Sequence, residues 1–400
     1  FGAYTESIMK FLKLNIYLYE LPELYYFLKK NLHIVTLNVP YPPDYGGMID
    51  CYHRIRSLKK NGIEVHLHAY EYGLPHAGKL EEICSTVSYY PRDTSFGRHL
   101  SALPYSVASR NSKKLLQNLA GDESPILFDG IQTTVFLADP SLAKRKKAVR
   151  LHNIEPRYYR TLAVHERDPV KKAYYLLEAA RLWRYEKILA HSDYLLTVSL
   201  ADHYYYNRRF RNSILIPSSH PFDRIEIKRG TGQYILYHAD LSVNENIAVA
   251  KFLIRKVFSR ISLPCIIAGK NPPPGLESEI LKHGNIQLAA NPGGDKMDDL
   301  INNAQINIIP TMAANGLKLK LLISLFRGRH CLANSTAVNA SGLYSLCHIA
   351  DNAEDMIRKI NLLFSQPFTG EMIEERKKVL CLKYDNMTNA GKVAAVFFQE

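Results

Sequence analysis

Three segments of the chain combine residue types and spacing that suit binding and chemistry. The first reads NVPYPPDYGGMIDCYHRIRSLKKNGIEV, in which a predicted strand ends at Val39 and a predicted helix follows Gly46 and Gly47. Paired glycines at a helix start let backbone N–H groups approach a ligand closely, and the helix dipole favours an anion there. A tight turn without a ligand would use the same residues, so both interpretations stay open.

The second segment, VRLHNIEPRYY, places His152 at the end of a predicted strand and Glu155 three residues later. An imidazole there would hydrogen-bond a polar substrate, and the carboxylate of Glu155 would orient a hydroxyl group. A lone histidine is usually structural, so this interpretation depends on its place at the carboxyl end of a strand. On that basis we predict His152 and Glu155 as the catalytic residues.

The third segment, IIPTMAANGLKLKLLISLFRGRHCLANS, leads from a predicted strand through Asn315 and Gly316 into a helix with Lys318 and Lys320 near its start. Such a helix start suits a pyrophosphate, because N–H groups contact one phosphate and an ammonium group neutralises another. Two lysines at i and i+2 cannot share one helical face, so we expect Lys318 to face the ligand. A solvated basic helix start is the alternative, which the unfavourable charge at a helix N-terminus disfavours unless an anion compensates it.

The elements that position these residues follow a repeated pattern. Short apolar runs alternate with helix-like stretches, which is typical of βαβ units and parallel sheets. Strands are predicted at residues 33–39, 64–70, 86–90, 125–130, 147–153 and 194–199, with the clearest helix at 169–190. The pattern restarts with strands at 234–239, 264–269, 285–290, 305–311, 329–334 and 346–350, and with helices at 246–261 and after residue 316.

A charged stretch, DRIEIKRGTGQ, separates the two repeats and shows no apolar periodicity, as expected of a linker. We therefore predict an α/β protein with an N-terminal Rossmann-like domain at residues 1–222 and a C-terminal Rossmann-like domain at 223–385. A helix at 386–400 is expected to pack back toward the N-terminal domain. Open parallel sheets bind ligands beyond the carboxyl ends of their strands, so the site is expected in a cleft between the domains.

Composition limits the class of protein. Of 400 residues, 46% are hydrophobic and 22% charged, and no uninterrupted apolar run reaches about 18 residues. Six dispersed cysteines without C-x-x-C spacing predict reduced core thiols and a cytoplasmic location. Residues 1–30 hold an apolar run that charges interrupt, which favours a packed helix or an extension over a signal peptide or a membrane-surface segment.

The formal charge of +13 is concentrated in the first half, where residues 1–222 hold 30 Lys and Arg against 21 Asp and Glu. This excess suits nucleic acid, an anionic membrane or a phosphorylated substrate. No zinc-finger spacing, RRM-like aromatic motif or dense Arg-rich tract is present, which argues against nucleic acid. The overlapping segments YYYNRR and RRFR at 204–211 combine arginine with aromatic residues and predict loose docking on an anionic membrane.

In this order and spacing, the three segments resemble the family-4-like GT-B glycosyltransferases over about Leu32 to Phe398, together with RYEKILAHSDYLLTVSLAD and IAGKNPPPGLESEI. The resemblance implies the GT-B fold, in which two Rossmann-like domains face each other across a cleft. It also implies a retaining hexosyltransferase that uses a nucleotide sugar and no tightly bound metal or cofactor. The acceptor would be a glycan or a lipid-linked glycan in surface polysaccharide biosynthesis, at the inner face of the membrane.

Residue by residue, the resemblance implies that Gly46 and Gly47 lie near the donor phosphate and acceptor, and that His152 contacts the transferring sugar. Gly316 and Lys318 match the G-x-K/R loop that meets the diphosphate, and Gly328 matches the glycine after the donor helix. Lys270 is a further candidate for phosphate binding. The predicted donor-binding set is thus Gly46, Gly47, Asn315, Gly316, Lys318, Lys320 and Lys270, with no metal ligand.

The chain also departs from the family pattern. Ile323 stands where members usually carry a glutamate for the ribose, and YHADLSVNEN lacks the basic residue that often follows the first strand of the second domain. These departures leave open a degenerate GT-B protein that binds a glycan or a partner transferase without catalysis. A nucleotide-sugar epimerase would need acid/base carboxylates that are not evident, and the lack of G-x-G-x-x-G argues against a dinucleotide-dependent oxidoreductase.

Overall fold

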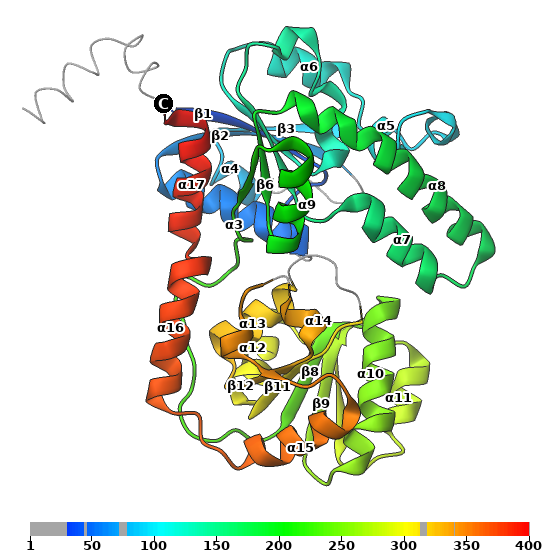
Figure 1. The fold of residues 1–400 in the computed structure, drawn as a ribbon, viewed down its shortest axis with the longest axis vertical. Coiled ribbons are helices and arrows are strands. Elements are labelled where there is room, and N and C mark those ends of the chain that lie inside the picture. The colour runs from blue at the N-terminus through cyan, green and yellow to red at the C-terminus, as the bar shows by residue number, and fades with distance from the viewer. Residues whose placement is uncertain (1–29, 44–45, 72–77, 313–317, 340, 400) are drawn as a thin grey trace, which may run out of the picture.

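The computed structural model describes residues 30–43, 46–71, 78–312, 318–339 and 341–399, which form two α/β units stacked on each other (Figure 1). Asn315 and Gly316 lie outside the described residues. Within the described ranges, no helix is both long and apolar enough to span a bilayer.

The N-terminal sheet has, in the described part of the chain, seven strands in the order β3-β2-β1-β4-β5-β6-β7, and neighbouring strands are parallel. These strands are β1 (Lys30–Thr36), β2 (Ile63–Glu71), β3 (Thr86–Pro91), β4 (Ile126–Asp129), β5 (Lys147–Leu151), β6 (Tyr194–Thr197) and β7 (Ser213–Leu215). The sheet is flanked by α3 (Gly46–Lys60), α4 (Gly78–Glu81), α5 (Tyr105–Ala108), α6 (Lys113–Leu119), α7 (Glu155–His165), α8 (Pro169–Tyr185) and α9 (Leu200–Phe210). Every residue of β4 and β5 is buried, as expected for parallel strands that helices cover on both faces.

The C-terminal sheet has six strands among the described residues, in the order β10-β9-β8-β11-β12-β13, again with parallel neighbours. They are β8 (Ile235–Asp240), β9 (Cys265–Lys270), β10 (Ile286–Ala290), β11 (Ile306–Ile309), β12 (His330–Ala333) and β13 (His348–Ile349). The helices of this unit are α10 (Asn244–Lys256), α11 (Pro274–Ile280), α12 (Gly294–Asn303), α13 (Leu319–Arg327), α14 (Ser335–Val338) and α15 (Ala353–Phe364). The α/β class and the two parallel sheets expected from the sequence are confirmed. The placement of domain boundaries at residues 222 and 385 stays a prediction.

Both sheets reverse their winding direction at one point, between β1 and β4 in the first and between β8 and β11 in the second. Ligands of doubly wound sheets bind beyond the carboxyl ends of the strands at this switch point. Helix α3 begins after β1, and α10 begins after β8. The segments that the sequence singled out at Gly46 and Lys318 follow β1 and β11, so both lie at switch points.

Two helices at the end of the described chain run along both units. Figure 1 shows α16 (Gly370–Tyr384) beside the C-terminal unit and α17 (Asn386–Phe398) beside the N-terminal unit. Helix α17 packs on α3 and adds Val393 and Phe397 to the hydrophobic core that also holds Leu32 of β1 and Val65 of β2. The core of the N-terminal unit is therefore completed by residues that come after the whole C-terminal sheet in the sequence.

The two places where the chain passes between the units are hydrogen-bonded to each other. Asn386 Nδ2 donates to the carbonyl oxygen of His220 at 2.7 Å, and His220 Nε2 lies 2.6 Å from the carbonyl oxygen of Tyr384. Because the 216–222 and 384–386 segments are joined in this way, they form one connection between the units.

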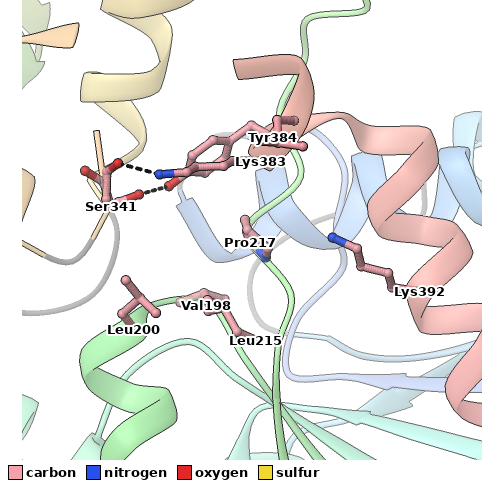
Figure 2. A pocket seen from close by; sticks show the side chains of 10 residues that line it. Val198, Leu200, Leu215, Pro217, Ser341, Lys383, Tyr384 and Lys392 are labelled. Atoms are coloured by element: carbon pink, nitrogen blue, oxygen red, sulfur yellow. Dashed lines mark hydrogen bonds between the residues drawn. The ribbon is translucent and has the colours of Figure 1, made fainter. Parts of the chain in front are cut away.

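A cavity of about 250 Å³ lies beside this connection (Figure 2). Its wall from the N-terminal unit is apolar and consists of Val198, Leu200, Leu215 and Pro217. On the opposite side, Lys383 Nζ donates to the carbonyl oxygen of Gly342 at 2.8 Å, and the Tyr384 hydroxyl donates to that of Ser341 at 2.8 Å. Polar contacts thus hold the end of α16 to the C-terminal unit, and the N-terminal unit lines the cavity with apolar side chains.

Replacing Phe397 with alanine tests the role of α17. Phe397 is 6% exposed in the N-terminal core, so Phe397→Ala is expected to lower the free energy of unfolding by about 3 kcal/mol. Urea denaturation measures this change. Leu382→Ala is the control, because Leu382 is 75% exposed on α16 and should change stability by less than about 0.5 kcal/mol. Equal effects of the two substitutions would contradict the packing of α17 in this core.

Candidate active site

A buried network of charged side chains lies at the carboxyl end of the N-terminal sheet. Asp50 and Arg54 come from α3, Asp129 ends β4, and Arg150 and His152 belong to β5 and the residue after it. Arg54 donates to Asp50 at 2.5 Å and to Asp129 at 2.6 Å, and Arg150 donates to Asp50 at 3.0 Å. The two aspartates and two arginines are each at most 2% exposed at the side chain, so they balance one another's charge without water.

The network also reaches the connection between the units. Asp50 accepts a hydrogen bond from the backbone N–H of Ser219 at 2.6 Å, and Arg150 donates to the carbonyl oxygens of Ile216 at 2.6 Å and Pro217 at 3.2 Å. Burial opposes ionisation of Asp50, but the charges of Arg150 and Arg54 outweigh it and hold its pKa below the ordinary value. The carboxylate is therefore ionised at neutral pH and can hold both arginines.

His152 is oriented by both carboxylates of this network. Its Nε2 lies 2.8 Å from Asp129 Oδ1, and its Nδ1 lies 3.7 Å from Asp50 Oδ2. The side chain is 16% exposed, so part of the ring faces solvent at the strand end. A ring held in this way has a fixed orientation, which is what contact with a substrate would require.

Glu155 opens α7 and is buried close to His152. Burial raises the pKa of Glu155 to about 7, although hydrogen bonds from Gln132 and Asn153 and the charge of His152 act in the opposite direction. At neutral pH this carboxyl group is present in both protonation states, which suits a group that donates and accepts a proton. The structure thus brings the two predicted catalytic residues to the same end of β5.

Gly46 and Gly47 begin α3 at the switch point of the same sheet. A Cβ atom added at Gly46 would meet no heavy atom within 4 Å, so packing within the chain gives no reason for glycine there. Gly328 is different, because an added Cβ would lie 2.2 Å from Asn307 Nδ2. The close approach of the loop after α13 to β11 explains that glycine without any ligand.

On the C-terminal unit, Lys318 and Lys320 gather around Glu245, which lies in the first turn of α10. Burial lowers the pKa of both lysines, that of Lys320 to about 8, and the charge of Glu245 opposes the effect. Glu245 also accepts hydrogen bonds from Thr311 Oγ1 at 2.5 Å and from the backbone N–H of Met312 at 3.3 Å. Two desolvated cations and one carboxylate leave an excess positive charge at this switch point.

The sequence argument that only one lysine faces a ligand rested on a wrong premise, and which lysine faces the ligand stays a prediction. It treated Lys318 as a helical residue, but Lys318 precedes α13 with extended dihedral angles of φ −83° and ψ 101°. Helical spacing therefore does not separate it from Lys320, and the charge of Lys318 itself lowers the pKa of Lys320. Lys318 is also partly buried.

The remaining predicted positions lie elsewhere. Lys270 is exposed at the end of β9, and β8 stands between β9 and β11. Ile323 is partly buried on α13 and packs against two apolar clusters of the C-terminal unit. No group of three or more His, Cys, Asp and Glu side chains suited to a metal ion occurs among the residues that the structure describes.

The residues around Glu155 in the N-terminal unit and those around Glu245 in the C-terminal unit approach each other between the units. The charges of Glu155 on its own helix and of Glu245 on the other unit both raise the pKa of Tyr158 of α7, after the larger effect of burial. A cavity of about 470 Å³ lies between the α7–α8 connection and the C-terminal unit. Its lining comprises Glu166, Arg167, Asn244, Glu245, Ile247, Ala248, Lys251, Pro273 and Met312. The carboxyl ends of β8, β9 and β11 therefore open toward α7 of the N-terminal unit.

Sequence reasoning missed Asp50, Arg54, Asp129 and Arg150, which position His152, and also Glu245. Asp50 and Arg54 are four residues apart on a helix, a spacing that resembles an ordinary solvated ion pair. Asp129 ends the apolar strand β4 and Arg150 interrupts β5. A charged residue in a strand that is buried on both faces was the signal that could have found them.

The pH dependence of stability tests the burial of Glu155. Its pKa rises from 4.5 to about 7 on folding, so the folded state loses stability, on the order of 3 kcal/mol, as the pH increases from about 4.5 through 7. Glu155→Gln should remove this loss. The free energy of unfolding of the variant, relative to that of the unchanged protein, should therefore be higher at pH 8 than at pH 5. Chemical denaturation at both pH values measures it, with the exposed Glu277→Gln as control; equal slopes for both variants would contradict the assignment.

No protein-family profile matches the sequence. An uncharacterised 44.6 kDa protein of the cps region of Klebsiella pneumoniae is 26% identical over 331 residues, which are 77% of this chain and 84% of that protein. The chain also resembles a glycosyltransferase of Rickettsia africae with a TM-score of 0.60 at 12% identity, over 93% of this chain and 100% of the other.

Two further solved structures contain ligands. Staphylococcus aureus TarM, as a variant in complex with fondaparinux, α-GlcNAc-glycerol and UDP, has a TM-score of 0.61 at 10% identity and covers 92% of this chain and 100% of its own. Anabaena HepE, in complex with UDP and glucose, has a TM-score of 0.58 at 11% identity and covers 91% and 98%. Similarity at these identities is a similarity of fold, and together with the two stacked parallel sheets it shows that the chain has the GT-B glycosyltransferase fold.

Proposed function

We propose that this protein is a glycosyltransferase that moves a sugar from a nucleoside-diphosphate sugar to a glycan or lipid-linked acceptor in surface polysaccharide biosynthesis. The observation that carries the proposal is the pairing of two switch points on a GT-B fold. The desolvated Lys318 and Lys320 follow β11 at one switch point, and His152 and Glu155 follow β5, the neighbour of β4 at the other. The relative from a cps region supports a place in polysaccharide assembly.

The donor diphosphate is assigned to Lys318 and Lys320, with Gly46 and Gly47 approaching it from the other unit. The oxygens of a diphosphate accept hydrogen bonds from the two ammonium groups in place of the water that burial removes. Its negative charge also compensates the positive charge that Glu245 does not neutralise. Among the structural neighbours, TarM and HepE are both seen with UDP. In this proposal the protein needs no tightly bound cofactor.

His152 is assigned to contact with the transferring sugar, because Asp129 and Asp50 hold its ring at the end of β5. A retaining transfer builds up positive charge on the sugar and negative charge on the leaving diphosphate, and polar groups that are fixed beforehand stabilise both. Glu155, with its pKa near 7, is assigned to proton exchange with an acceptor hydroxyl.

A degenerate GT-B protein that binds a glycan or a partner transferase is the second candidate, and Ile323 favours it. The side chain packs into the C-terminal unit and offers no carboxylate for a ribose. The two candidates differ in turnover. If the purified protein neither transfers sugar to any acceptor nor slowly hydrolyses any donor that it binds, the enzyme proposal fails and the binding protein remains.

Donor binding tests the lysine assignment. A thermal-shift screen with UDP, GDP, ADP, CMP and their sugars identifies the nucleotide, because a ligand of the folded state raises the melting temperature. Lys318→Ala and Lys320→Ala should then each weaken donor affinity roughly 10- to 150-fold in calorimetric titrations. Lys256→Ala, at an exposed position on α10, is the control. Unchanged affinity in both test variants would place the diphosphate elsewhere, and Lys270→Ala examines the next candidate.

Turnover tests the role of His152. His152→Ala is expected to lower the rate per folded molecule by about 100-fold or more, while nucleotide affinity stays nearly unchanged. Rates and melting temperatures are measured together, with the exposed His191→Ala as control. A variant that loses melting temperature but keeps its rate would show that the histidine only supports the ion network.

A further inference from the structure

The outer face of α8 exposes a stripe of large apolar side chains. Val170, Leu176, Leu177 and Trp183 are 76%, 51%, 50% and 55% exposed. Their spacing puts them on one side of the helix, and the exposed Ala173 and Ala180 lie between them. Figure 1 shows α8 along the outer edge of the N-terminal unit. Single exposed apolar residues are common, but a continuous stripe of them marks an interaction surface.

The exposed charged side chains of α8, and of the 3-10 turn Glu186–His191 that follows it, are basic. Lys171, Lys172, Arg184 and Lys187 are exposed, and they take part in none of the ion pairs found among the described residues. The acidic residues of this stretch, Glu178 and Glu186, are both fully buried, where they pair with Arg181 and Arg209. The exposed side of α8 therefore combines apolar side chains with positive charge, and the exposed carboxylate of Asp168 caps the start of the helix.

A short helical turn beside α8 extends the apolar surface. Phe96 and Leu100, in the 3-10 turn Phe96–Leu100, are 76% and 74% exposed. The turn is held to α8, because Arg181 Nη2 donates to the carbonyl oxygen of His99 at 2.9 Å. The rings of His99 and Tyr174 also lie 6.1 Å apart. We use "α8 face" for these two residues together with Val170, Leu176, Leu177, Trp183 and the exposed Lys172, Arg184 and Lys187.

The segment that the sequence singled out for membrane contact, 204–211, is partly used within the protein, while Tyr204, Arg208 and Arg211 are exposed. Tyr206 is fully buried, and Arg209 pairs with Glu186 and lies over the ring of Tyr205. Only Tyr204 among its tyrosines is strongly exposed. Exposed large apolar side chains beside exposed basic residues occur on α8 as well, and membrane contact of 204–211 stays a prediction.

We propose that the α8 face docks on a bilayer that contains anionic lipid. Amphipathic helices bind such surfaces through an apolar stripe that enters the boundary between headgroups and acyl chains, with lysines and arginines beside it. Tryptophan prefers this boundary, and a protein partner matching this face would have to supply all of the negative charge itself. The inference rests on the proposed function to the extent that a lipid-linked acceptor would then lie near the catalytic groups.

The start of α8 lies close to the cavity between the units. Glu166 and Arg167 line the cavity between the units, and α8 begins two residues later at Pro169. Asp168 fixes this start, because its carboxylate accepts from the backbone N–H of Val170 at 2.8 Å and of Lys171 at 3.2 Å. A membrane in contact with the α8 face therefore lies beside the mouth of the cavity.

Trp183 is the single tryptophan of the chain, so its fluorescence reports directly on this face. The full chain is titrated with vesicles of phosphatidylcholine, with and without phosphatidylglycerol, in the absence of donor and acceptor. With phosphatidylglycerol, the emission should shift to the blue, and the protein should sediment with the vesicles less as salt increases. Absence of binding, or equal binding to phosphatidylcholine alone, would overturn the proposal.

Matched variants locate the surface. Lys172→Gln combined with Arg184→Gln should weaken vesicle binding roughly 10- to 30-fold, and Leu177→Ser should weaken it several-fold. The controls are Lys282→Gln and Leu281→Ser, which change exposed residues of the C-terminal unit, Leu281 being 80% exposed. Equal losses in test and control variants would overturn the assignment to α8. A concentration-dependent dimer that Leu177→Ser abolishes would also overturn it and make the face a contact between copies.

Nucleotide binding separates this proposal from the proposed function. The α8 variants should keep the donor affinity of the unchanged protein, because none of the altered residues lines the cavity between the units. If vesicles bind but no nucleotide does, the docking surface stands and the transferase proposal fails. If nucleotides bind but anionic vesicles do not, the docking proposal alone is lost.

Discussion

The ion network at the carboxyl end of the N-terminal sheet is the constraint on which the candidate site depends. Asp50 accepts hydrogen bonds from Arg54, Arg150 and the backbone N–H of Ser219. It also lies 3.7 Å from Nδ1 of His152. Desolvation of four charges costs about as much as their attraction returns, so such a network contributes geometry more than stability. Because each member has partners on different elements, α3, β4, β5 and the segment between the units can be assembled in only one relative arrangement.

The two halves of the candidate site differ in net charge. In the N-terminal unit, carboxylates and guanidinium groups balance, and a histidine stands at the edge of a neutral cluster. In the C-terminal unit, two lysines share one carboxylate and keep an excess of positive charge. An anionic ligand would therefore be drawn to the second unit, while the first unit offers a rigid polar surface to a neutral sugar.

The sequence predicted most strands because buried parallel strands are continuous apolar runs between helices. It missed β7, a strand of three half-buried residues, and placed β1 three residues too late at both ends. The sequence located the candidate site because the predicted residues directly follow strands, and ligands of such sheets bind beyond the carboxyl ends of the strands near the switch point. It could not find Glu245, since its role depends on a partner 66 residues away in the chain. Nor could it tell that Tyr206 of α9 is packed inside whereas Trp183 of α8 is exposed.

The position of α17 has a consequence for how the protein is made. On the ribosome, β1 to β7 emerge first, yet the core between β1, β2 and α3 lacks Val393 and Phe397 until the C-terminal sheet has been synthesised. The nascent N-terminal unit therefore carries an uncovered apolar strip on α3 throughout translation of the second unit. Folding of this chain cannot finish in the order of synthesis, and a holding chaperone has a defined surface to cover in the interval.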